Sequence, residues 1–144
     1  MNIYETIDLI RIKLEEGKHN QSDLLFGYNI VIDPYSDLSK KIPLVLIEAD
    51  RTEFYTHSEY GTPVAMDHYL SLTVFESAQK NEFEDYKPKV NIFVKNLVNK
   101  LMMIDDYRIS KLIPEELSHN EAQIGSLKVT GVVIGIKVRT DWED

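Results

Sequence analysis

Residues 126–139, SLKVTGVVIGIKVR, decide the fold class of this chain. Apolar and polar side chains alternate along the stretch, which is the pattern of a β-strand with one buried face. The alternation shifts by one residue at Gly131, so that Leu127 and Val129 precede the shift and Val132 follows it. We therefore predict a long strand with a β-bulge at Gly131 that returns the apolar side chains to the buried face.

An earlier stretch, residues 90–104 (VNIFVKNLVNKLMMI), provides a layer to cover such a strand. Its apolar residues recur at helical spacing and form one stripe: Val90, Phe93, Val94, Leu97, Val98, Leu101 and Ile104. The polar residues around them are expected to face the solvent: Lys87, Lys95, Asn96, Asn99 and Lys100. Pro88 is compatible with a helix only in its first turn, so the helix is predicted to begin close to it.

A second helix is marked at both of its ends near the start of the chain. Asn2 suits the N-cap, and Glu5 three residues later completes a capping-box pattern. Gly17 suits the left-handed position just past the helix. The apolar residues between these signals form one stripe: Ile3, Ile7, Ile10 and Leu14. The sequence therefore predicts a helix with one face against the sheet.

Several strands are predicted between and after the helices: residues 28–32, 42–49, 66–75 and the short segment 107–112. Residues 114–123 are predicted to form an acidic loop. Consecutive strands without an intervening helix favour antiparallel pairing, and two amphipathic helices suffice to cover one face of a sheet. We therefore predict a single α+β domain over residues 1–144, with a mainly antiparallel sheet of four to five strands covered by two helices.

Composition excludes several classes of protein. The chain carries 24 acidic and 16 basic residues, for a formal net charge of −8, and such a surface repels a polyphosphate backbone. The absence of cysteine excludes disulfides and thiolate metal sites. The first 16 residues mix charged with apolar positions, and no apolar run approaches membrane-spanning length. We expect a protein made in the cytoplasm, with no membrane partner.

Three acidic residues are candidates for a metal site. Asp33, Glu48 and Asp50 lie near predicted strand ends and have the oxygen ligands that Mg²⁺ prefers. A two-metal nuclease also needs a lysine close by on the same strand, and position 50 holds aspartate instead. Because acidic residues at strand ends are normally solvated, we expect no metal site.

Other catalytic patterns are incomplete in this sequence. No two histidines have the helical i, i+4 spacing of a zinc site. Ser58 beside His57 lacks the Gly-x-Ser-x-Gly turn of a nucleophile elbow. Gly125, Gly131 and Gly135 interrupt a strand pattern, and no helix begins after them as a phosphate loop requires. We therefore expect no catalytic residues and no cofactor.

The segment 50–63 is the feature that folding explains least. It is predicted to be a loop or an extended hairpin tip, and it is long for a connection in a small domain. It carries aromatic residues interleaved with basic ones, which is the composition of a protein–protein contact surface: Arg51, Phe54, Tyr55, His57 and Tyr60. We predict that these five residues bind a partner. The alternative is a hairpin that packs its aromatic side chains on its own sheet.

The order of these elements resembles the tail terminator, or tail completion, proteins of tailed bacteriophages. The resemblance includes the opening helix, the Ile-Pro-aliphatic run at residues 42–46, a strand at 69–75, a helix at 88–104 and a glycine-containing last strand at 131–139. It spans nearly the whole chain but consists of element order and size, and it does not account for the acidic segment 113–123.

The resemblance implies a virion structural protein of the tail or neck, without catalysis or cofactor. Such a protein forms a ring, expected to be a homohexamer, on the last ring of the tail tube protein. It also docks with the neck or head–tail connector protein during virion assembly, and DNA contacts it only as passing cargo. Two alternatives stay open: another phage neck or head-completion protein, and a small metal-dependent nuclease-like enzyme that uses Asp33, Glu48 and Asp50.

Overall fold

A computed structural model of the chain describes residues 1–33, 35, 37–56, 61–77, 86–124 and 127–142. Its elements are α1 (Ile3–Glu15), β1 (Asn29–Val31), the 3₁₀ turn η1 (Leu38–Lys40), β2 (Leu44–Thr56), β3 (Pro63–Ser77), α2 (Tyr86–Met102), β4 (Lys111–Ile124) and β5 (Leu127–Asp141). No helix in the described part of the chain is long and apolar enough to cross a membrane.

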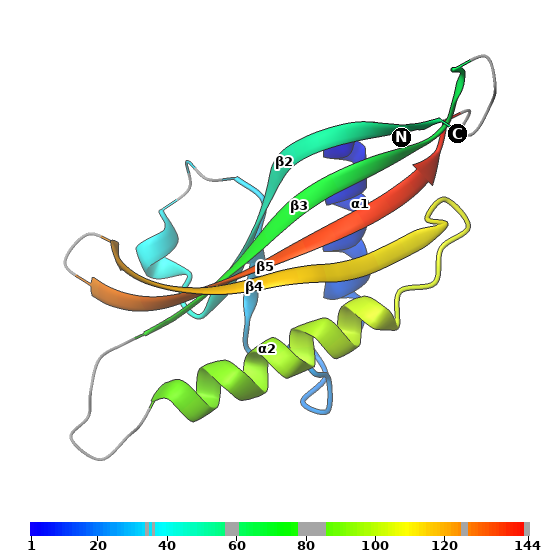
Figure 1. The fold of residues 1–144 in the computed structure, drawn as a ribbon. Helices are drawn as coiled ribbons and strands as arrows, with labels where there is room; N and C mark the ends of the chain where they lie inside the picture. Colours follow the sequence, from blue (N-terminus) through cyan, green and yellow to red (C-terminus); the bar gives the residue numbers. More distant parts are fainter. Residues whose placement is uncertain (34, 36, 57–60, 78–85, 125–126, 143–144) are drawn as a thin grey trace.

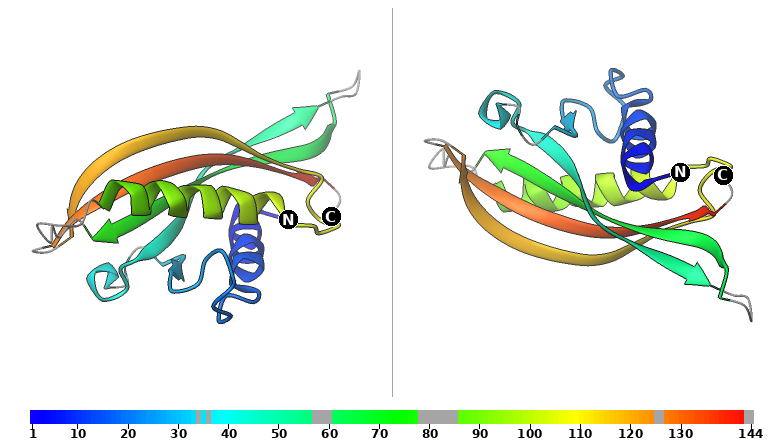
Figure 2. Two further views of the ribbon diagram at one scale, coloured as in Figure 1. Left: turned by 90° about the horizontal axis from the view of Figure 1, so that it is seen from below. Right: turned by 90° about the horizontal axis from the view of Figure 1, so that it is seen from above.

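Within these residues, five strands form one sheet in the order β1-β2-β3-β5-β4 (Figure 1). Only the short β1 pairs in parallel, with β2, and the other neighbours are antiparallel. Both helices lie on the same side of the sheet, as the two views of Figure 2 show. The predicted α+β fold, with a mainly antiparallel sheet covered by two helices, is confirmed.

The main core lies between the helices and one face of the sheet. α1 contributes Ile7, Ile10 and Leu14, and α2 contributes the stripe centred on Phe93 and Leu97. The strands contribute alternate residues of β3 and β5, which are buried: Leu70, Leu72, Val74, Val132, Ile134, Ile136 and Val138. The opposite face of the sheet, called here the open face, carries a small apolar cluster of Val31, Leu44 and Leu46 near η1.

The start of α1 has the predicted capping box. The Asn2 side chain accepts a hydrogen bond from the backbone N–H of Glu5 at 2.8 Å, and the Glu5 carboxylate accepts one from the backbone N–H of Asn2 at 3.2 Å. Two donors at the helix start are thus satisfied reciprocally. Gly17 follows the helix with φ +72°, the left-handed conformation predicted for it.

The predicted bulge at Gly131 is wrong. β5 pairs with both β3 and β4 in continuous register through this residue. Register shifts occur instead between Ala49 and Arg51 in β2 and between Pro114 and Glu116 in β4. The physical reason is position, because β5 is hydrogen-bonded on both sides whereas β4 and the outer part of β2 border the sheet, where bulges are tolerated best.

The predicted acidic loop at residues 114–123 is also wrong, since this segment belongs to strand β4. This strand pairs with β5 along its length. The side chains from Glu115 to His119 are exposed, because β4 is an edge strand and neither helix covers this part of it. The sequence therefore lacks the apolar alternation by which a half-buried strand is recognised, although the backbone forms a full ladder.

Lys100 differs from the prediction that it faces the solvent. Its ammonium group donates to the Asp23 carboxylate at 2.8 Å and to the Glu16 carbonyl oxygen at 3.0 Å. Burial alone would raise the pKa of Asp23, but hydrogen bonds from Lys100 and from the backbone N–H of Leu25 outweigh it and lower that pKa. The pair ties α2 to the segment that follows α1.

The core arrangement predicts the effect of truncating α2. Leu97 is fully buried between the helix and the sheet, so Leu97→Ala leaves a cavity and is expected to destabilise the domain by about 2–5 kcal/mol. Lys95 is exposed on the same helix, and Lys95→Ala is the matched control. Chemical denaturation measures both variants. Equal midpoints for the two would mean that the buried face of α2 is assigned wrongly.

Candidate functional site

The strands β2 and β3 project beyond both helices and form what we call the arm, residues 50–56 and 63–67, with the end of β5, residues 139–142, beside it (Figure 2). Every residue of β2 from Glu48 to Thr56 is exposed. β2 continues to Thr56 and β3 begins at Pro63. The segment predicted to be a loop or hairpin tip, residues 50–63, therefore consists mostly of paired strands. Neither of the described helices covers either face of the arm (Figure 2).

A cross-strand ion pair holds the open face of the arm together. Arg139 of β5 lies opposite Asp67 of β3 and donates two hydrogen bonds to its carboxylate, at 2.7 and 3.0 Å. The hydrogen bonds from Arg139 lower the pKa of Asp67, although its partial burial acts in the opposite direction. The same guanidinium lies over the ring of Tyr55, 4.0 Å from its centroid. Three strands are thus joined through one arginine.

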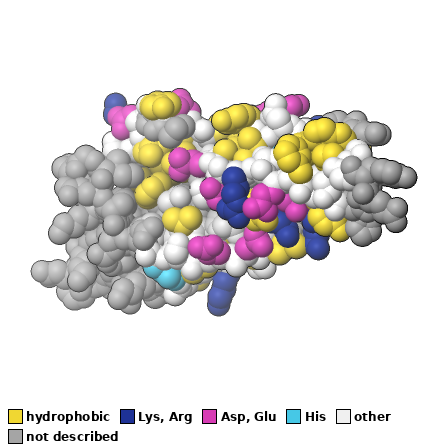
Figure 3. All heavy atoms as spheres, turned by 45° about the horizontal axis from the view of Figure 1, so that its top comes forward, with side chains coloured by type: hydrophobic (Ala, Val, Ile, Leu, Met, Phe, Trp, Pro, Cys, Tyr) yellow, Lys and Arg dark blue, Asp and Glu magenta, His cyan; other side chains and the backbone are white. Residues whose placement is uncertain are grey.

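A second arginine joins β2 to β3 one row further along the open face. The Arg51 guanidinium lies 3.9 Å from the centroid of the Tyr69 ring and bonds Glu53 at 3.1 Å and Asp50 at 2.9 Å. The Tyr69 hydroxyl also donates to Glu53, at 3.1 Å. Acidic and basic side chains lie side by side over the centre of the molecule in Figure 3, which views it partly from this side. Arg51 and Arg139 are thus each paired with carboxylates of this face.

The other face of the arm is apolar. Phe54 and Trp142 meet edge to face with their ring centroids 5.6 Å apart, and the Trp142 backbone N–H donates to the Val64 carbonyl at 3.1 Å. Phe54 is 62% exposed, Trp142 42% and Val64 44%. Neighbouring positions on this face hold Thr52, Met66 and Thr140, so none of its six residues is charged. We call Phe54, Val64 and Trp142 the arm patch.

A buried histidine marks the place where the arm leaves the core. His68 Nε2 lies 3.1 Å from the Met1 carbonyl oxygen and 3.1 Å from Thr140 Oγ1, and Nδ1 lies 2.9 Å from Thr52 Oγ1. Because a carbonyl oxygen only accepts, Nε2 carries the proton and Nδ1 accepts from the Thr52 hydroxyl. Neutral His68 therefore links β2, β3, β5 and the start of the chain.

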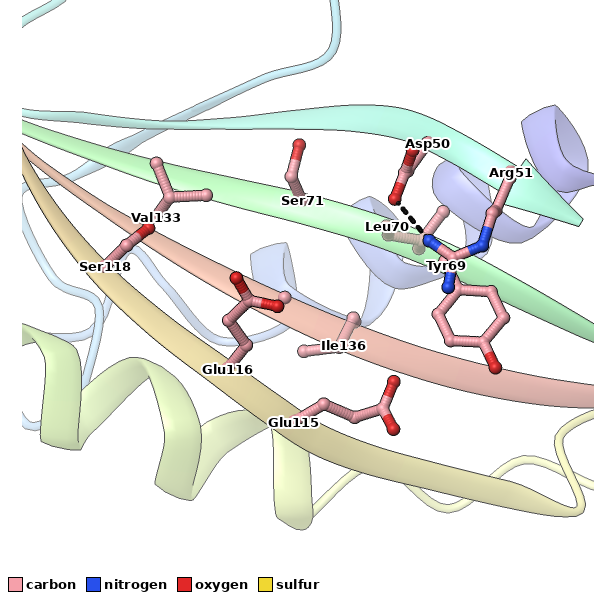
Figure 4. Close-up of a pocket in the computed structure, with 11 residues that line it drawn as sticks. Asp50, Arg51, Tyr69, Leu70, Ser71, Glu115, Glu116, Ser118, Val133 and Ile136 are labelled. Carbon is pink, nitrogen blue, oxygen red and sulfur yellow. Dashed lines mark hydrogen bonds and ion pairs between the residues drawn. The ribbon is translucent and has the colours of Figure 1, made fainter.

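A shallow pit lies between the two bulges on the open face (Figure 4). It has a volume of about 220 Å³, and Asp50 and Glu115, the extra residues of the β2 and β4 bulges, lie on its opposite walls. At its centre, Gly135 leaves space below the Glu116 side chain, since a Cβ there would lie 3.5 Å from Glu116 Cβ. The pit is thus a product of the two bulges and one glycine.

The candidate metal ligands do not form a recognisable site. In the described part of the chain, no group of three or more histidine, aspartate or glutamate side chains is arranged to hold a metal ion. Asp50 is ion-paired with Arg51 at 2.9 Å, and Glu48 is exposed on the open face. The geometry thus gives no support to Asp33, Glu48 and Asp50 as a ligand set.

The five predicted partner-binding residues divide among three places. Arg51 and Tyr55 lie on the open face, where both are stacked within the chain. Phe54 lies on the opposite face, in the arm patch. His57 and Tyr60 lie outside the described residues. The structure therefore does not gather these residues into one surface, and their binding role stays a prediction.

Sequence reasoning missed Val64 and Trp142. Val64 lies between the predicted loop 50–63 and the predicted strand 66–75, and Trp142 lies far away in sequence. The signal that could have found them is strand alternation, because Val64, Met66 and His68 share one face of β3. Only the register of β3 with β5 places Trp142 beside them.

The chain matches no model of a known protein family, and no curated protein matches its sequence.

The buried histidine predicts a pH dependence of stability. Burial is the main cause that lowers the pKa of His68 below its ordinary value of 6.5, and the N-terminal amine lowers it further, against the hydrogen bond to Met1 and the charge of Asp67. The folded state then binds fewer protons than the unfolded state. The stability that neutral His68 contributes is full above pH 6.5 and is lost as the pH falls below it.

Urea denaturation between pH 7.5 and about 5 measures this loss as a falling midpoint. His68→Gln should flatten the profile, whereas His119→Gln, a change at an exposed position of β4, should leave it unchanged. The assignment fails if the wild-type and His68→Gln profiles run parallel.

Proposed function

We propose that the protein is a virion structural protein that forms a ring, caps the tail tube of a tailed phage and joins it to the neck or head connector. The observation that carries the proposal is the arm. It extends the sheet beyond the helices and presents the arm patch, which no element of the described chain covers. Exposed apolar surface of this kind is typical of a protein–protein contact.

The construction of the arm supports an assembly role. Its open face is stiffened by the Arg139–Asp67 ion pair and by two arginine–tyrosine stacks. A binding element that is already ordered loses less conformational entropy when it binds. A rigid arm with one apolar face is therefore well suited to a subunit that must meet its neighbours in a fixed geometry.

The charge of the chain fits a role in which DNA is cargo. With a formal net charge of −8, the protein lacks the excess of basic residues that holds a phosphate backbone. On the open face, Arg51 and Arg139 are engaged by carboxylates of the same chain. A ring of such subunits would surround DNA without retaining it.

Mass measurement of the purified protein, alone and with its tail tube protein, tests the proposal. We expect a ring, most simply a hexamer, either in the free protein or on the tube. A free monomer that becomes a ring on the tube agrees with the proposal. A protein that stays monomeric and does not bind the tube contradicts it.

The arm should be required for this assembly but not for folding. Replacing Phe54 and Tyr55 together by alanine removes exposed aromatic area, and we expect it to weaken ring formation or tail docking by about 2 kcal/mol or more if either residue is a hot spot. Tyr35→Ala is the control, because Tyr35 is an aromatic residue, 95% exposed, outside the arm. Sedimentation and circular dichroism measure assembly and folding. Normal particles with the double variant would refute the assignment of the arm.

A further inference from the structure

A second surface with exposed apolar side chains lies away from the arm, between the segment that follows α1 and the outer side of α2. It is a groove of about 350 Å³ whose lining includes Phe26, Tyr28, Ile92 and Phe93. Tyr28 and Phe93 form its floor as a stacked pair, with centroids 3.5 Å apart and planes at 15°. Phe26 is 46% exposed and Ile92 58%. We call this surface the aromatic groove.

The two carboxylates of the aromatic groove are satisfied within the chain. The Tyr28 hydroxyl donates to Glu76 at 2.8 Å, and burial together with this bond raises the pKa of Tyr28, which keeps the phenol neutral. Asp23 is paired with Lys100 at 2.8 Å. The remaining polar lining residues, Gln21 and Asn96, are uncharged amides. Among the described lining residues, the groove therefore combines exposed aromatic and aliphatic side chains with amides, one ion-paired carboxylate and one hydrogen-bonded carboxylate, a mixture that occurs at interface hot spots.

We propose that the aromatic groove receives the arm patch of a second copy of this chain. This inference rests on the proposed ring function and names the partner of the arm. Two copies that each carry a net charge of −8 repel one another unless they meet through neutral surfaces. The arm patch has no charged residue, and in the groove Asp23 is neutralised by Lys100 while Glu76 accepts from the Tyr28 hydroxyl, so the contact brings no like charges together.

Size and placement agree with this contact. A cavity of about 150 Å³ is large enough for a benzene ring, so the groove has room for the ring of Phe54 or Trp142. The arm and α2 lie on opposite sides of the molecule in Figure 1. Two unlike surfaces on opposite sides make a head-to-tail contact, which closes into a ring when the rotation is right.

Disulfide crosslinking tests the contact, and the absence of cysteine from the natural chain makes it specific. The double variant Phe54→Cys with Ile92→Cys, oxidised at high protein concentration, should give a ladder of linked chains longer than a dimer. Each chain then carries one cysteine on the arm and one in the groove. Phe54→Cys alone should give little dimer. Pairing Phe54→Cys with Lys95→Cys, an exposed position of α2 outside the groove lining, is the matched control.

Two crosslinking results would contradict the proposed contact between the arm patch and the groove. Efficient dimers from Phe54→Cys alone would show arm-to-arm contact, and equal ladders from the Lys95 control would show random collision; either result overturns the inference.

A second experiment uses Ile92→Asp, a change at an exposed position of the groove that should weaken ring formation about tenfold or more. Rings that form on the tail tube with full strength in this variant would overturn the groove contact and leave the proposed function standing. Failure of the wild-type protein to form any ring would overturn both.

Discussion

Strand length and helix length are mismatched in this protein, and the rest of the structure depends on that mismatch. β3 and β5 have 15 residues each, which span about 50 Å, whereas the 13 and 17 residues of α1 and α2 span only about 20 and 26 Å. Two helices of these lengths cannot cover the sheet from end to end. They bury its middle, and the outer part of β2 and β3 extends beyond them as the arm.

The arm must therefore hold its shape without a core of its own. Hydrophobic burial is replaced there by cross-strand pairs, of which Arg139 with Asp67 is the best formed because both side chains are largely shielded from water. The Arg51 pairs are more exposed, so water screens them and they contribute less to stability. His68 closes the base of the arm, where its hydrogen bonds connect three strands with the start of the chain.

The two faces of the arm have different roles as a consequence. On the open face, the charged and aromatic side chains contact one another. These residues therefore stabilise the arm itself and are less available for contacts with a partner. The apolar face has no comparable use within the chain, and the exposure of Phe54, Val64 and Trp142 costs the isolated protein hydrophobic stabilisation. Assembly through the aromatic groove would recover that stabilisation without bringing like charges together.

The sequence by itself determined what depends on near neighbours. The capping box of Asn2 and Glu5, the left-handed Gly17 and the buried stripes of both helices are local patterns, and all are as predicted. The α+β class followed from the order of those patterns. Tertiary structure decided what depends on distant residues. β4 is a strand because β5 supplies its hydrogen bonds, Lys100 is buried because Asp23 accepts from it, and the bulges lie where the sheet has edges. The arm patch likewise unites Phe54 with Trp142 through strand register, since alternation assigns each residue to a face and only pairing across the sheet brings the two together.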